Sequence, residues 1–256
     1  MPQTTAPTRS VTTGILWWLC LCIAPVVLVA IELFHPAGFT QTPGMWEYLS
    51  QPEPYSPAHK ALAYFAPTWW FTLHMIQTPM VGLVCIGLWV MVQGIDVTEN
   101  VLAGVFAWLS RIATFVIIIY FTALDAIGGF GLGRYILTTQ ELAAGGKLTQ
   151  EQLRGEITLL NALWVDPWVG GVGSFVSLTA SWAVFFAALF AALALFLARR
   201  APVLPLVIFV AIFGWQLPLT HAALHGPVAF VGLIVSAGWL WFRGGSEPGM
   251  TGLRWV

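Results

Sequence analysis

Long apolar runs, separated by polar or proline-rich stretches, dominate the hydropathy pattern of this chain. The runs cover about residues 14–34, 68–92, 101–124, 174–197, 203–219 and 227–242. Each approaches the roughly 20 apolar residues that a helix needs to cross a bilayer. The pattern therefore predicts an all-α, polytopic integral membrane protein, with about six transmembrane helices forming a single bundle over residues 1–256 in the cell membrane.

Two polar stretches between the runs are long enough to have structure of their own. Residues 35–67 are rich in proline and aromatic residues, which is typical of an ordered loop in the headgroup region. Within residues 125–173, Thr149 and Gln152 form a capping-box pattern that opens an amphipathic stretch. We expect this stretch to be a helix that lies over the bundle.

The positions of the basic residues predict the orientation in the membrane. Arg199, Arg200 and Arg243 directly abut the ends of apolar runs, where the excess of cytoplasmic Lys and Arg is most informative. We therefore expect both termini in the cytoplasm and the two loops, 35–67 and 125–173, on the extracytoplasmic side.

Composition changes this picture by excluding some classes of protein. With 58% hydrophobic and 8% charged residues, the chain cannot cover a soluble surface. The net charge of −1 and the absence of basic clusters exclude a nucleic-acid partner. The expected partners are membrane lipids and, as an alternative, other membrane subunits. Cys20, Cys22 and Cys85 lie in apolar runs and are interpreted as small hydrophobic residues.

The ionisable residues within the apolar runs gather at one predicted face of the membrane. Such residues are costly to keep in a membrane and usually mark functional sites. With alternating helix directions, the outer ends of the runs carry Glu32, His35, His74, Gln77, Asp125, His221 and His225.

Spacing strengthens this prediction on individual helices. Glu32 and His35 are three residues apart, as are His74 and Gln77, so each pair projects from one helical face. One member of a pair could bind a metal or a haem while the other orients the ligating side chain. His221 and His225 are four apart, a spacing that places two imidazoles on one zinc-like ion if the segment is helical.

Each of these residues also has a purely structural interpretation. His35 would cap a helix at the interface, and His74 would bond to Gln77 or to a backbone carbonyl within the helix packing. Asp125 would face water or pair with an arginine, and His221 and His225 would be solvated loop residues.

The His221-Ala-Ala-Leu-His225 run, with His74 on an earlier helix and Asp125 between them, is distantly similar to the zinc-dependent membrane hydrolases that include the alkaline ceramidases. That resemblance implies a zinc ion bound by three histidines. The chain departs from the family because Trp70 stands where a serine precedes the first histidine, and because about six helices are predicted rather than seven.

The first functional hypothesis is an outer-leaflet site that binds a metal ion (zinc, iron or copper) or a haem, and that acts on a lipid-like substrate or in redox chemistry. Asp125 and Glu32 are its candidate catalytic residues, and His74, Gln77 and His221 its candidate cofactor-binding residues. The candidate metal ligands are His35, His74, Asp125, His221 and His225.

Two other functions stay open as alternatives, a subunit of a membrane complex and a transporter. Whether the protein is an enzyme stays open too. The chain could be a non-catalytic subunit that organises a pigment, quinone or haem in a larger membrane complex. It could also transport a small solute or protons, with Glu32, His74, Asp125 and Arg111 as relay groups. The lack of ionisable residues in the inner half of several runs counts against transport.

Overall fold

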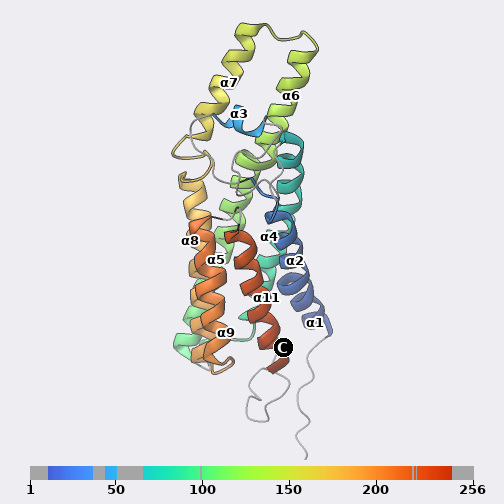
Figure 1. The fold of residues 1–256 in the computed structure, drawn as a ribbon. Coiled ribbons are helices and arrows are strands. Elements are labelled where there is room, and N and C mark those ends of the chain that lie inside the picture. Colours follow the sequence, from blue (N-terminus) through green and yellow to red (C-terminus); the bar gives the residue numbers. More distant parts are fainter. Residues whose placement is uncertain are drawn as a thin grey trace, which may run out of the picture.

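A computed structural model describes residues 11–36, 44–50, 66–98, 100–220, 222 and 224–243. These residues form helices and turns, with no strand among them. The helices form an elongated bundle, and the start of α1 (Val11–Trp18) and the end of α11 (His225–Arg243) lie at the same end of it (Figure 1). The all-α prediction is confirmed.

Five helical stretches of the described residues are long and apolar enough to cross a membrane. They are Val11–Glu32, Pro67–Met91, Val101–Ala144, Phe175–Leu197 and His225–Arg243. The remaining predicted run forms a shorter apolar helix, Val203–Leu219. The prediction of a helical membrane bundle is thus confirmed, with five clear spans and one shorter helix, whereas the side on which the termini lie stays a prediction.

The third span continues well beyond its predicted end. Helix α5 (Val101–Leu124) runs into a π-helical segment, η3 (Asp125–Gly131), and then into α6 (Leu132–Ala144). At 1.5 Å per residue this helix is about 66 Å long, whereas the hydrocarbon core is about 30 Å thick. The expectation that Asp125 ends the third helix is therefore wrong. The glycines after Asp125 bend the helix at Gly129 (φ −94°, ψ −107°) without ending it.

Much of the stretch 125–173, expected to be a loop, is helical. The predicted capping box is present: Thr149 and Gln152 bond to each other's backbone at the start of α7 (Gln150–Trp164). Instead of lying over the bundle, however, α7 stands beside α6 as a hairpin at one end of the molecule (Figure 1). A short helix, α3 (Met45–Leu49), packs against this hairpin. The rest of the predicted loop 35–67 lies mostly outside the described residues.

The long contact between α5 and α8 (Phe175–Leu197) is built from small side chains. Ala103 and Ala107 of α5, and Ala187 and Ala191 of α8, are fully buried. The Ser110 hydroxyl of α5 donates a hydrogen bond to the Ala187 carbonyl at 3.0 Å. Small residues let helices approach closely, which is how membrane helices gain van der Waals contact.

The other elements complete the bundle around α4 (Pro67–Met91). The N-terminal span is α1, the π-helical segment η1 (Leu19–Ile23) and α2 (Ala24–Glu32), and residues 203–219 comprise α9 (Val203–Ile208), η4 (Phe209–Gly214) and α10 (Trp215–Leu219). Helix α4 begins with Pro67 at its first position, where the missing N–H costs nothing. It packs against α2, α5 and η3, so residues from several spans meet on its buried face.

Candidate functional site

The structure brings together the predicted polar residues of the first three spans. They come from the end of α2 and the residues after it, from α4 and from η3, and they are Glu32, His35, His74, Gln77 and Asp125. None of these five side chains is more than 3% exposed. Buried polar groups are costly unless they are bonded, so their partners indicate what each can do.

Two histidines form the centre of this cluster. The Nδ1 atom of His74 lies 2.7 Å from the Trp70 carbonyl, and Nδ1 of His35 lies 2.7 Å from the Pro36 carbonyl. A carbonyl can only accept, so both Nδ1 atoms carry the proton, and in the neutral rings the lone pair is on Nε2. The ring centroids of His35 and His74 are 5.3 Å apart. The cluster thus holds two imidazoles of the same tautomer side by side.

Close packing fixes the orientation of the His74 ring. Its centroid lies 4.6 Å from the Trp70 ring, and the Trp70 indole N–H donates to the Gly128 carbonyl at 2.9 Å. On its other side the ring contacts Gly129, where an added Cβ would lie 2.5 Å from Cδ2 of His74. The bend at Gly129 therefore brings bare backbone against the imidazole, which no residue with a side chain would permit.

Glu32 and Gln77 form a side-chain pair between α2 and α4. The Gln77 Nε2 donates to Oε1 of Glu32 at 2.7 Å, and both residues are fully buried. The second oxygen of each group, Oε2 of Glu32 and Oε1 of Gln77, is buried with no hydrogen-bond partner among the described residues.

Asp125 is bonded to α4 through a residue that sequence reasoning missed. The Thr78 hydroxyl lies 2.8 Å from Oδ2 of Asp125 and 2.9 Å from the His74 carbonyl. The other carboxyl oxygen of Asp125, Oδ1, is buried and has no hydrogen-bond partner among the described residues. A signal for Thr78 did exist in the sequence, since it lies four residues after His74 and therefore on the same helical face.

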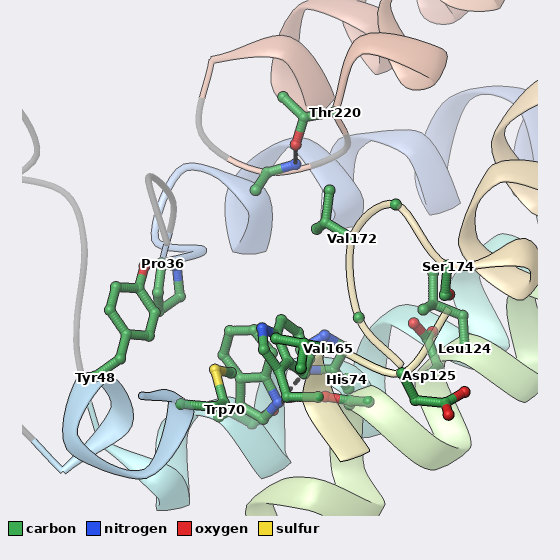
Figure 2. A pocket seen from close by; sticks show the side chains of 18 of the residues that line it. Pro36, Tyr48, Trp70, His74, Leu124, Asp125, Val165, Val172, Ser174 and Thr220 are labelled. Carbon is green, nitrogen blue, oxygen red and sulfur yellow. Dashed lines mark hydrogen bonds between the residues drawn. The ribbon is translucent and has the colours of Figure 1, made fainter. Parts of the chain in front are cut away.

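A cavity of about 600 Å³ adjoins the cluster. Figure 2 shows Trp70 and His74 side by side in its wall, with Tyr48 and Asp125 toward opposite sides. The turn after α7 and the residues between α10 and α11 also line it, through Trp164, Ser174, Thr220 and Ala222. Glu32 and Gln77 are not among the lining residues.

Tyr48 adds a hydroxyl to this cavity from the short helix α3. It is 1% exposed, and burial raises the pKa of its phenol well above the ordinary value, so the hydroxyl keeps its proton at neutral pH. With Tyr48, Ser174, His35, His74 and Asp125, the cavity offers hydrogen-bond donors and acceptors beside aromatic walls. The imidazole and carboxyl groups are also able to transfer protons.

The predicted residues of the last two spans do not join the cluster as far as they are described. His221 lies outside the described residues. His225 begins α11, and its Nδ1 lies 2.7 Å from the side-chain oxygen of Gln216. His225 is not among the residues that line the cavity. Thr220, Ala222 and Leu224 are not helical, so the described part of the segment before His225 does not continue a helix.

Within the part of the chain that the structure describes, no three His, Cys, Asp or Glu side chains are grouped so as to hold a metal ion. The metal and haem hypotheses, which included His221 as a ligand, stay predictions.

Arg111, a candidate relay group, has a structural contact at the other end of the bundle. Its guanidinium donates to the Val92 carbonyl at 3.0 Å and lies 5.0 Å from the centre of the Trp108 ring. Arg200 donates to the carbonyls of Gln93 and Gly94, at 3.0 and 2.6 Å. Both arginines thus bind carbonyls at the C-terminal end of α4, where the helix dipole favours positive charge.

An apolar layer lies between the cavity and this arginine end. It contains Leu88, Ile117, Phe121, Phe213 and Phe230, which surround a void of only about 20 Å³. No charged side chain is among the residues that line this void.

Comparisons with protein-family models, curated proteins and solved structures find no match to the chain.

Proposed function

We propose that this membrane protein binds an amphiphilic, lipid-like molecule in the cavity beside the His35–His74 pair. The polar group of the ligand lies against His35, His74 and Asp125, and its apolar part lies along Trp70 and Trp164. The protein is proposed to hold the ligand where the two imidazoles and the carboxyl can exchange protons with its polar group.

One observation carries this proposal: buried polar side chains and aromatic rings line the same cavity of about 600 Å³. Ligand cavities typically combine apolar and aromatic walls with a few polar groups that orient the ligand, and they have volumes of this order. The apolar layer below the cavity favours binding at one end of the bundle over transport through it.

The test is a binding measurement with a defined probe, an alkyl alcohol that carries bromine atoms on its chain. Bromine quenches tryptophan fluorescence on contact, so a probe bound beside Trp70 and Trp164 should give saturable quenching in protein reconstituted into nanodiscs. His74→Ala removes a hydrogen-bonding group from the wall, and we expect binding to weaken about tenfold, the effect of losing about 1.4 kcal/mol.

His225→Ala is the matched control, because it removes the same side chain from outside the cavity lining. It should bind the probe as the wild type does. Saturable quenching that is equal in the wild type and in both folded variants would show that the probe binds elsewhere, and the proposal would be wrong. A wild type that shows only non-saturable quenching would contradict it too.

A further inference from the structure

The Glu32–Gln77 pair contains an unusual arrangement of hydrogen-bonding atoms. One hydrogen bond joins the two groups, from Nε2 of Gln77 to Oε1 of Glu32 at 2.7 Å. The two remaining oxygens, Oε2 of Glu32 and Oε1 of Gln77, both lack a partner among the described residues. An ionised carboxylate has no proton to donate, so the amide oxygen would stay unsatisfied in a fully buried place.

A single proton removes both defects. If Glu32 is a carboxylic acid, its O–H can donate to Oε1 of Gln77 while its other oxygen accepts from Nε2. An acid and a primary amide joined in this way form a closed pair in which each group donates once and accepts once. Exchanging the nitrogen and oxygen of the Gln77 side chain does not change this conclusion, because an oxygen 2.7 Å from Glu32 would also require a proton between them.

The surrounding charges favour the same state. No Lys or Arg of the described residues bonds to Glu32: Arg111 and Arg200 bind the carbonyls of Val92 to Gly94, which lie about 22 Å further along α4 from Gln77. Asp125 is a second carboxyl within electrostatic range of Glu32, and two nearby carboxyls disfavour double ionisation. The other titratable groups around Glu32 are His35, which follows it, and His74 on α4. Helix α11 also packs against α2, and its titratable groups are His225 and Arg243, at the two ends of the helix.

We infer that Glu32 and Gln77 form a proton-binding site, in which Glu32 is held as a neutral carboxylic acid beneath the cavity. The Glu32 carboxyl is therefore an acid that stores a proton. This inference rests on the pair alone and does not depend on the ligand proposed for the cavity.

Infrared spectroscopy of the purified protein at neutral pH tests this inference without any ligand. A protonated carboxyl has a C=O stretching band that is separate from the bands of carboxylates and shifts in D₂O. Wild-type protein should show such a band, and Glu32→Gln should lack it. Glu141→Gln, which changes an exposed glutamate that pairs with Arg134, should keep the band. Wild-type protein labelled with ¹³C-glutamate should show the same band shifted, which provides the test even if Glu32→Gln does not fold.

Thermal unfolding supplies a second measurement. A glutamine at position 32 can donate and accept as the neutral acid does, so Glu32→Gln should unfold at the wild-type temperature, whereas Glu32→Leu should unfold at a lower one. A wild type without a glutamic-acid band would overturn the inference, because Glu32 would then be ionised. A wild type stabilised by Na⁺, with this effect lost in Glu32→Gln, would overturn it in favour of a cation held between the two oxygens.

Discussion

The two ends of α4 both contain buried polar groups, but these groups are satisfied in different ways. At the C-terminal end, Arg111 and Arg200 donate to backbone carbonyls of the turn that follows the helix, at Val92, Gln93 and Gly94. At the N-terminal half, Gln77 and the two carboxyls of the cluster each keep an atom without a hydrogen-bond partner among the described residues.

This difference separates a structural role from a functional one. The turn after a helix contains backbone carbonyls that need donors, so arginines that bind these carbonyls are explained by the fold alone. In contrast, helix α4 needs no carboxyl group from a neighbouring helix, such as that of Glu32 or Asp125, in order to end or to pack. Buried polar atoms that the fold does not require, and that it leaves partly unsatisfied beside a cavity, are better candidates for binding a proton or a ligand.

The largest effect that would sharpen this comparison is expected from Gly129→Ala. The new methyl group would overlap the His74 ring, whose Nδ1 is held by the Trp70 carbonyl, so the ring cannot move aside without losing that bond. We expect the free energy of unfolding to fall by about 2–3 kcal/mol and probe binding to weaken as in His74→Ala. Thermal unfolding in detergent and the fluorescence assay measure the two effects. Gly82→Ala is the control, since nothing lies within 4 Å of its added Cβ.

Arg200→Met should change stability and leave the cavity intact. It removes the donors to the Gln93 and Gly94 carbonyls, and we expect a loss of about 2 kcal/mol in the free energy of unfolding with unchanged probe binding. Arg199→Met, at the exposed neighbouring arginine, should cost much less. If Arg200→Met weakened probe binding as strongly as His74→Ala does, the distinction between the two ends of α4 would be lost.

The smallest expected effect is a gain in stability from Arg199→Gly. Arg199 has a φ of +54°, in the left-handed region that glycine adopts without steric cost. We expect the free energy of unfolding to rise by about 0.5–1 kcal/mol, with no change in probe binding. Arg199→Ala removes the same charge but keeps a Cβ, so it should not give this gain. Equal stability of the two variants would show that the charge, and not the backbone conformation, sets the effect.

Parts of the site followed directly from the sequence. His74 and Gln77 lie one turn apart on α4, as predicted, and both are buried near Glu32, His35 and Asp125. Helix α2 ends at Glu32, however, so His35 does not share a helical face with Glu32. The spacing on α4 could be read from the sequence because helical periodicity and the length of a membrane span together place residues at a given depth and on a given face.

Other parts could not be predicted. Thr78 bonds to Asp125 because α4 packs against η3, and the spacing along either helix does not specify this contact between them. The contact that Gly129 makes also depends on how two helices pack, which the sequence alone does not specify. Gly129 contacts the ring of His74 on α4. The place of Tyr48 and Trp164 in the cavity wall depends on how α3 and α7 pack.

The sequence by itself determined that this is a helical membrane bundle in which Glu32, His35, His74 and Asp125 lie toward one end, because hydropathy and helical spacing are local properties of the chain. The tertiary structure decided which of those residues meet, which oxygens are left without donors and where a cavity opens. These features depend on distances between helices, and such distances are set by packing at a bend and at small residues rather than by the pattern along any single helix.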